Sequence, residues 1–226
     1  YPPAGGRASA RAMHTERAKA VLREAGVPGA ESRVVSRAEA ALGHPIDPPD
    51  VIKPPAEGSS VGVYIIREDQ AHPPQELNAA DWALGEELMV ERYIHGRELT
   101  CAVIGEEALG VIEIRPADGL TFYDYESKYA PGGSIHVLPA ALKLNVYQMV
   151  HKLSVAAQRA LGCRGVSRSD VRFDDRPEGT GELICLEINT QPGMTSTSLV
   201  PELAAYAGRS FGDLVRWIVE DASCNR

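Results

Sequence analysis

The chain has 226 residues, 44% of them apolar and 24% charged, and carries a formal net charge of −8. This is an ordinary globular composition, long enough for one large domain or two small ones. The negative charge argues against nucleic acid as the main partner, because such binding depends on clustered lysine and arginine. The apolar runs are far too short to span a membrane, so we expect no membrane partner.

Other features of the chain bear on its cellular setting. No basic segment followed by an apolar run opens it, so we expect no signal peptide. Cys101, Cys163, Cys185 and Cys224 are scattered without a CxxC pair. Three of them sit among apolar or small residues, which is typical of buried free thiols in a reducing cytosol, and we expect a cytoplasmic protein. Because the chain begins at Tyr1 rather than Met, we expect a fragment or a chain missing its upstream part.

The first elements are predicted from apolar spacing and from turn residues. Ala18, Val21 and Leu22 fall on one stripe of a helix expected over 14–25, which Gly26-Val27-Pro28 ends. The elements expected next are a short helix at 34–42, a turn at 47–50, a strand beginning at Val51-Ile52, a small-residue loop at 53–63, a strand at 64–66 and a loop at 70–80.

The rest of the chain mixes strands with two long helices. We expect strands at 87–93, 98–104, 109–114, 168–173 and 183–189, and helices at 144–161 and 211–222. Residues 117–136 form a long irregular stretch whose aromatic residues indicate a functional loop rather than disorder. Strands with interspersed helices, including antiparallel pairs, predict an α+β or mixed α/β fold.

The stretch LEINTQPGM, residues 186–194, places Glu187 and Asn189 two apart at the end of a strand. Side chains at i and i+2 share one face of a strand. The pair is either an exposed strand end or part of a divalent metal site, because carboxylate and amide oxygens are ligands that Mg²⁺ accepts. In RSDVRF, residues 168–173, Arg168 and Asp170 share a face in the same way, as a simple ion pair or as part of that site.

Two further motifs are compatible with nucleotide binding. In KPPAEGSSVGV, residues 53–63, glycines and serines allow backbone N–H groups to converge on an anion beside Lys53, although a flexible connection fits equally well. In ERYIHGRE, Glu91 and Glu98 flank a turn at Gly96. These carboxylates could accept hydrogen bonds from an adenine amino group or a ribose hydroxyl, or could be solvated charges.

Taken together and in this order, these motifs resemble the ATP-grasp ligases and, among them, the D-alanine–D-alanine ligases. The resemblance extends from about Ala8 to Asp221. The residues that carry it are KPPAEGSSVGV, FYDYESKY at 122–129, GCRGVSRSDV at 162–171 and LEINTQPGMTSTSLVP at 186–201.

The resemblance implies an ATP-grasp fold with the nucleotide between two antiparallel sheets. It implies that Lys53 and the Ser59-Ser60 loop hold the ATP phosphates, with Lys128 above them. Glu91 and the backbone of Arg92 and Ile94 would read adenine, Glu98 the ribose, and Phe122 would pack on the base. Asp170, Glu187 and Asn189 match the ligands of two Mg²⁺ ions, for which Mn²⁺ could substitute.

The implied reaction joins two D-alanines through an acyl phosphate, for a peptidoglycan precursor. Arg168 and the backbone N–H of Gly193 would stabilise the oxyanion, and Ser59 and Tyr129 would also be catalytic. Ser198 and Leu199 would bind the second substrate. Lys128 and Tyr129 would close over the site, and Tyr129 resembles the dipeptide-forming branch rather than the D-lactate-using relatives.

The sequence departs from the family pattern in two places. The family usually carries Asp-Lys where this chain has His14-Thr15, and helical geometry would put the nearby Arg17 and Lys19 on other faces. Residues 1–13 are expected to be a remnant of a further N-terminal domain or a linker, 14–95 a central subdomain and 96–226 a C-terminal one. The resemblance suggests a homodimer in the full-length protein. The alternatives are a Mg–ATP-binding module without ligase activity and an ATP-grasp ligase for another carboxylate.

Overall fold

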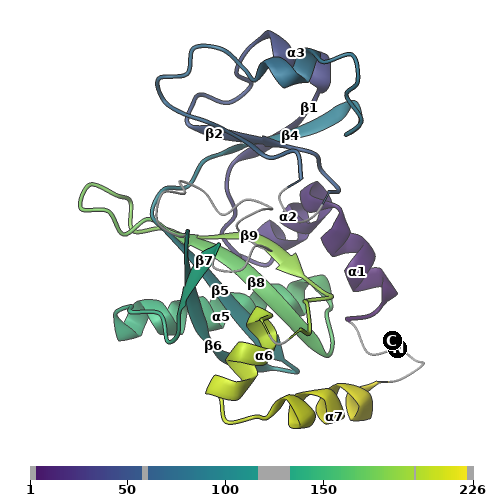
Figure 1. Ribbon diagram of the computed structural model, residues 1–226, viewed down its shortest axis with the longest axis vertical. Coiled ribbons are helices and arrows are strands. Elements are labelled where there is room, and N and C mark those ends of the chain that lie inside the picture. The colour runs from purple at the N-terminus through teal and green to yellow at the C-terminus, as the bar shows by residue number, and fades with distance from the viewer. Residues whose placement is uncertain (1–3, 58–60, 117–132, 196, 223–226) are drawn as a thin grey trace.

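In the computed structural model, which describes residues 4–57, 61–116, 133–195 and 197–222, the chain forms two antiparallel sheets (Figure 1). The four-stranded sheet has the order β1-β4-β2-β3, and the five-stranded sheet has the order β7-β6-β5-β8-β9. The strands are β1 Ser32–Ser36, β2 Asp50–Lys53, β3 Tyr64–Ile66, β4 Glu87–Arg92, β5 Arg97–Ile104, β6 Glu107–Pro116, β7 Ser134–Val137, β8 Val166–Phe173 and β9 Leu183–Asn189. The predicted mixture of helices and antiparallel strands is confirmed.

The helices lie mostly around the larger sheet (Figure 1). They are α1 Gly6–Met13, α2 Thr15–Glu24, α3 Arg37–Leu42, α5 Leu144–Leu161, α6 Leu199–Tyr206 and α7 Phe211–Asp221, with one 3₁₀ turn, η1 Gln75–Asn78. None of the helices in the described ranges is long and apolar enough to cross a membrane.

The smaller sheet buries one face and leaves the other for a cavity. Side chains alternate along a strand, so Ile52 of β2 and Val90 of β4 point into an apolar cluster under α3 and η1. Lys53 and Glu91, one residue further along their strands, point to the opposite face and line a cavity. The alternation of apolar and polar residues therefore decides which face of this sheet carries charge.

The larger sheet divides its residues in the same way. Leu99 and Cys101 of β5 and Val171 of β8 pack with Val150 of α5 on one face. On the other face, α6 and α7 cover one end of the sheet, where Val166 and Ile104 are buried. The uncovered end of that face carries polar residues instead.

The two N-terminal helices, α1 and α2, pack on the larger sheet's side of the molecule. Leu22 of α2 and Ala8 of α1 share an apolar cluster with Leu161 of α5 and Ile188 of β9. The predicted division at 95/96 falls between β4 and β5, which belong to different sheets. The contacts of α2 with α5, however, join the predicted central subdomain to the other one.

A sharp turn at Gly96 links the two sheets. Gly96 has a φ of 91°, in the region that favours glycine. A Cβ atom built there would lie 2.1 Å from the carbonyl oxygen of Phe173. The turn therefore requires glycine, and it brings the end of β4 beside the end of β8.

Most predicted elements are present, and one helix and one strand match the prediction at both ends. Helix α5 covers 144–161 and strand β9 covers 183–189, as predicted. The prediction of a helix at 34–42 is wrong for its first residues: Val34 and Val35 pair with β4, and α3 starts at Arg37, where Ser36 accepts a hydrogen bond from the Glu39 N–H.

Other short elements were not anticipated. Residues 134–137 of the expected irregular stretch form β7, because they pair with the edge of β6, and residues 117–132 lie outside the described ranges. The expected loop at 70–80 contains the η1 turn. Helices α1 and α6 were not predicted; each has only eight residues, which gives a weak periodic signal.

Candidate active site

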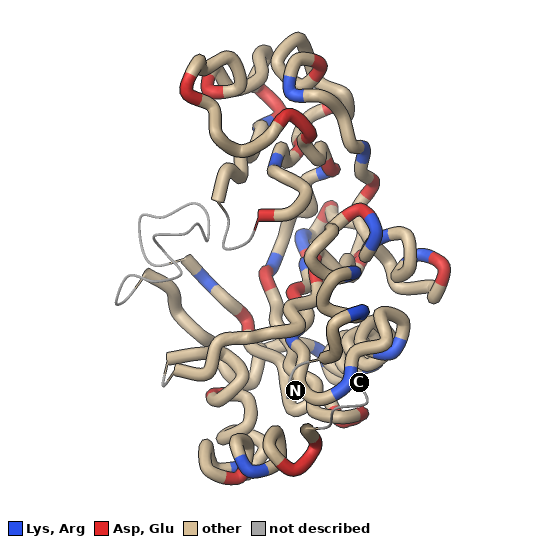
Figure 2. The backbone as a smooth tube through the Cα atoms, turned by 90° about the vertical axis from the view of Figure 1, so that its right-hand side faces the viewer, with Lys and Arg blue, Asp and Glu red and all other residues tan. Residues whose placement is uncertain are grey.

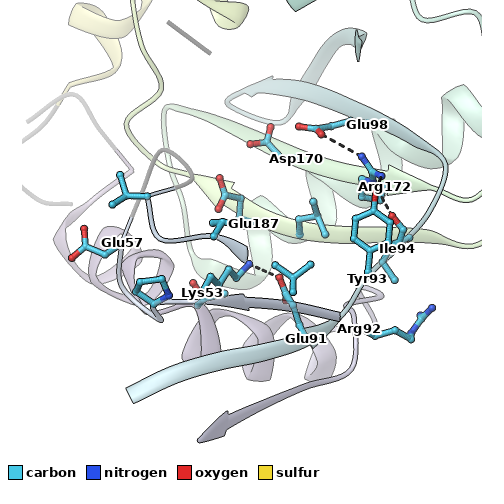
Figure 3. A pocket seen from close by; sticks show the side chains of 16 residues that line it. Lys53, Glu57, Glu91, Arg92, Tyr93, Ile94, Glu98, Asp170, Arg172 and Glu187 are labelled. Carbon is cyan, nitrogen blue, oxygen red and sulfur yellow. Dashed lines mark hydrogen bonds and ion pairs between the residues drawn. The ribbon is translucent and has the colours of Figure 1, made fainter. Parts of the chain in front are cut away.

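A cavity lies between the uncovered faces of the two sheets (Figure 3). Its walls come from β2 and β4 of the smaller sheet and from β5, β8 and β9 of the larger one. The charged residues that line it are Lys53, Glu57, Glu91, Arg92, Glu98, Asp170, Arg172 and Glu187. Along the backbone, Figure 2 shows acidic and basic positions of both signs in the region between the sheets.

Glu91, on the wall from the smaller sheet, is paired with two lysines. Lys53 of β2 contacts one carboxylate oxygen of Glu91, and Lys19 of α2 contacts the other. Glu91 is only 3% exposed, and its burial favours the neutral acid. Lys53 and Lys19 outweigh that effect and hold the pKa of Glu91 below its ordinary value. The cluster therefore carries two positive charges and one negative charge.

Lys53 is the lysine of this cluster that lines the cavity. Its burial favours the neutral amine, but the carboxylates of Glu91 and, more weakly, Glu187 outweigh burial and raise the pKa of Lys53. Figure 3 shows the Lys53 side chain running from β2 to Glu91. Lys53 is therefore a protonated ammonium within the cavity wall.

The wall from the larger sheet carries the predicted acids and amide. In the register of β8 and β9, Arg168 lies opposite Asn189 and Asp170 lies opposite Glu187. Arg168 forms a two-pronged ion pair with Asp170, at 3.0 Å from Nε to Oδ1 and 2.7 Å from Nη2 to Oδ2. The prediction that two adjacent strands would bring these four residues together is confirmed by this register.

These residues fit a divalent cation by their chemistry. The two carboxylates and the Asn189 amide offer the oxygen atoms that Mg²⁺ accepts. The Oδ1 atom of Asn189 accepts a hydrogen bond from the Gln191 N–H at 2.9 Å, which fixes the orientation of the amide. Thr100, buried in β5, donates to Asp170 Oδ1 at 2.8 Å. The set consists of two acids and an amide, and no group of three or more acids, histidines or cysteines suited to a metal occurs in the described ranges.

Arg172, which sequence reasoning missed, connects the larger sheet to the segment after β4. Its guanidinium donates to the Ile94 carbonyl at 3.0 Å, to the Tyr93 hydroxyl at 3.0 Å and to Glu98 at 3.3 Å (Figure 3). It also lies 5.4 Å from the centre of the Tyr93 ring. The RxDxR spacing of 168–172 could have indicated it, because residues i, i+2 and i+4 of a strand share a face.

Arg92, the residue before Tyr93, does not take part in the Arg172 contacts. It forms an ion pair with Glu182, with contacts of 2.8 and 3.0 Å. The Arg92 side chain is therefore engaged in a structural ion pair, so that the predicted contact with adenine would come from the Arg92 backbone. Ile94 is 3% exposed and packs with Ala30 and Ile184, so the same holds for Ile94.

The predicted substrate residues, Ser198 and Leu199, lie at the start of α6. The Ser198 hydroxyl accepts a hydrogen bond from the Thr195 N–H at 3.0 Å. A Cβ atom at Gly193 would lie 2.8 Å from Ser198 Oγ, so a side chain at position 193 would displace the Ser198 hydroxyl. The Leu199 side chain is buried in the core under α6, which leaves its backbone for any substrate contact.

Several predicted site residues lie outside the described ranges. These are Ser59, Ser60, Phe122, Lys128 and Tyr129. Thr15, by contrast, lines the cavity, where the family pattern expects a lysine. Lys19, which we expected on another helix face than Thr15, does not line the cavity. Its ammonium instead contacts Glu91 from behind the cavity wall. Arg17 is exposed, as expected.

Two antiparallel sheets that enclose a cavity lined by a lysine and several acids are the arrangement of the ATP-grasp fold. Residues 17–220 match the family model for the C-terminus of D-ala D-ala ligase. A D-alanine–D-alanine ligase of Methylorubrum populi is 64% identical over 226 residues, which are 100% of this chain and 73% of that protein. The chain belongs to the D-alanine–D-alanine ligase family.

Solved structures support the same conclusion. The crystal structure of a D-alanine–D-alanine ligase from Bacillus anthracis superimposes with a TM-score of 0.75 at 30% identity, covering 97% of this chain and 70% of that one. The structure of that ligase complexed with ATP gives a TM-score of 0.72 at 29% identity, covering 97% of this chain and 69% of that one.

Proposed function

We propose that the chain catalyses the ATP-dependent joining of two D-alanines to D-alanyl-D-alanine, a peptidoglycan precursor. The observation that carries the proposal is the β8–β9 register, which sets Arg168, Asp170, Glu187 and Asn189 on one face. Two of these residues, Asp170 and Glu187, line the cavity together with Lys53 and Glu91. The similarity to named ligases at 64% identity supports the same substrates.

ATP would lie between the two sheets in this proposal. The Lys53 ammonium would bind the phosphates, Glu91 with the backbone of Arg92 and Ile94 would contact adenine, and Glu98 would accept from a ribose hydroxyl. Arg172 already holds Glu98 and the Ile94 carbonyl in place. Such preformed contacts reduce the ordering that binding must impose.

Asp170, Glu187 and Asn189 would hold Mg²⁺, with two ions as the finer proposal. When bound, the cation would neutralise charge on the phosphates during transfer. The Thr100 hydroxyl and Arg168 would keep Asp170 oriented toward that position. The oxygen ligands are hard donors, so Mn²⁺ could replace Mg²⁺.

The reaction would proceed in two steps that balance charge and atoms. A carboxylate oxygen of the first D-alanine attacks the γ-phosphorus, ADP leaves, and an acyl phosphate forms. The amine of the second D-alanine then attacks the acyl carbon, and phosphate leaves with loss of a proton from nitrogen. Arg168 and the Gly193 N–H would stabilise the tetrahedral oxyanion, a contribution of about 3 kcal/mol for one such donor. Ser198 and the Leu199 backbone would hold the second substrate's carboxylate.

D-Alanine-dependent phosphate release tests this function. The chain would be incubated with ATP, Mg²⁺ and D-alanine, with the product identified by mass, and ATP binding measured separately. Release of phosphate with dipeptide formed is the expected result. Parallel reactions with D-serine or D-lactate as the second substrate would reveal a different specificity.

A second candidate function is Mg–ATP binding without ligation. The observation that favours it is Thr15 at the cavity wall, where the family pattern expects a lysine. ATP binding without any phosphate release would support this second function. The homodimer of the full-length protein remains a proposal, which sedimentation of the full-length protein would test.

A further inference from the structure

Lys19 is a buried charge that the proposed reaction does not yet use. It is 5% exposed and lies behind the cavity wall, on α2. Its ammonium contacts the Glu91 carboxylate and lies 3.3 Å from the Ala30 carbonyl oxygen. Burial lowers the pKa of Lys19, and Glu91 opposes that shift. A lysine in such a place needs a negative partner, and Glu91 supplies it.

The two lysines on Glu91 are not equivalent. Lys53 lines the cavity, and its side chain is 17% exposed, so its ammonium is near enough to the cavity to meet a ligand. Lys19 is not among the residues that line the cavity. A phosphate that attracts Lys53 must draw it away from Glu91. Without a second cation, that movement would leave a buried carboxylate unpaired, which is costly.

We propose that Lys19 is a positioning residue that keeps Glu91 neutralised and so allows Lys53 to bind a nucleotide phosphate. The inference rests on the proposed function, which places ATP phosphates at Lys53. Lys19 never touches the nucleotide. It supplies the charge that Glu91 requires once Lys53 has turned to the phosphates.

A purely structural role for Lys19 makes a different prediction. If Lys19 only held α2 against β4, its removal would lower the affinity for every ligand of the cavity equally, or would change none of these affinities. If Lys19 frees Lys53, removing the Lys19 charge lowers the affinity for ligands that carry phosphates. The affinity for adenosine, which has no phosphate, stays unchanged. The ratio of ATP affinity to adenosine affinity therefore separates the two roles.

The first experiment compares Lys19→Met with Arg17→Met, an exposed basic residue of the same helix. Calorimetric titration with ATP and with adenosine would give both affinities. We expect Lys19→Met to lower the affinity for ATP on the order of tenfold and the affinity for adenosine less than twofold. Arg17→Met should leave both affinities unchanged. Equal losses for ATP and adenosine, or an unchanged ATP affinity, would overturn the inference.

A second background removes the charge that Lys19 compensates. In Glu91→Gln the amide carries no charge, so adding Lys19→Met should change ATP affinity less than twofold. A tenfold loss in this background as well would overturn the inference. If Lys19→Met does not fold alone, the comparison of Glu91→Gln with the double variant decides. Failure of the unaltered chain to bind ATP would instead overturn the proposed function together with this inference.

Discussion

The two walls of the cavity balance their charges in opposite ways. At the smaller sheet, Lys53 of β2 and Lys19 of the adjacent helix α2 contact one acid, Glu91, which leaves this cluster with an excess of positive charge. On the larger sheet, Asp170, Glu187 and Glu98 share a face with two arginines, Arg168 and Arg172, which leaves an excess of negative charge. One wall is thus suited to anions such as phosphates and the other to cations.

The difference follows from how deeply each set is buried. Glu91 is almost fully buried, so it must be paired within the protein. Asp170 and Glu187 lie at the uncovered end of the larger sheet, where solvent or a ligand can share their charge. The buried acid is neutralised within the protein by two lysines, whereas the acids of the open wall outnumber its arginines, which suits that wall to a cation.

Glu187→Gln is expected to have the largest effect, because it removes a charge from the open wall. We expect Mg²⁺-dependent nucleotide affinity to fall on the order of 100-fold, with affinity in the presence of a chelator nearly unchanged. Titrations with and without Mg²⁺ measure both. Glu86→Gln, an exposed acid paired with Arg37, is the matched control. An unchanged Mg²⁺-dependent affinity would refute the metal assignment.

Asp50→Asn tests how a buried acid of the smaller sheet affects stability when, unlike Glu91, it has no ion pair with a lysine. Asp50 is fully buried on the covered face, where burial raises its pKa to about 6 despite His44 nearby. The folded state therefore binds the proton more tightly than the unfolded chain does, and stability is lost as the pH rises from about 4 to about 6. We expect the variant to be more stable by about 2 kcal/mol at pH 7, with the gain absent near pH 4.

Denaturant titrations at several pH values would measure this effect. Asp47→Asn, an exposed acid three residues earlier, is the control and should show no such pH dependence. A gain of the same size at pH 4 and pH 7 would contradict the titration of Asp50 as its cause.

Lys53→Ala removes the cavity-facing charge of the buried wall. We expect ATP affinity to fall on the order of tenfold, because the lysine supplies a point charge for phosphate. The chain should remain folded, because Lys19 still pairs with Glu91. Calorimetry for binding and thermal melting for stability would check this, with Lys152→Ala as an exposed control. Early melting with normal ATP binding would make Lys53 structural instead.

Thr15→Lys is expected to have the smallest effect. Thr15 lines the cavity on the side of Lys53, so a lysine there would add positive charge to the wall that already favours anions. We expect ATP affinity to stay equal or to rise a few-fold. The same titration measures it, and His14→Lys, at the neighbouring exposed position, is the control. Clear weakening would show that Thr15 does not occupy the position of the family's lysine.

The strands of the site, and the residues that share a face of each strand, could be predicted from the local sequence alone. Strict alternation places Glu187 with Asn189 and Arg168 with Asp170 whatever the rest of the fold does. Long apolar periodicity likewise determined helix α5 at both ends. These features depend on local chain geometry, which is why they can be read from neighbouring residues.

The contacts between charged residues that are far apart in the sequence could be seen only in the tertiary structure. The pairing of Lys19 with Glu91 joins residues 72 positions apart, and that of Arg172 with Ile94 joins residues 78 apart. The packing of α2 on α5 and the turn at Gly96 create both contacts. A helical wheel shows which face Lys19 occupies, but not what that face packs against, because burial is set by the whole fold.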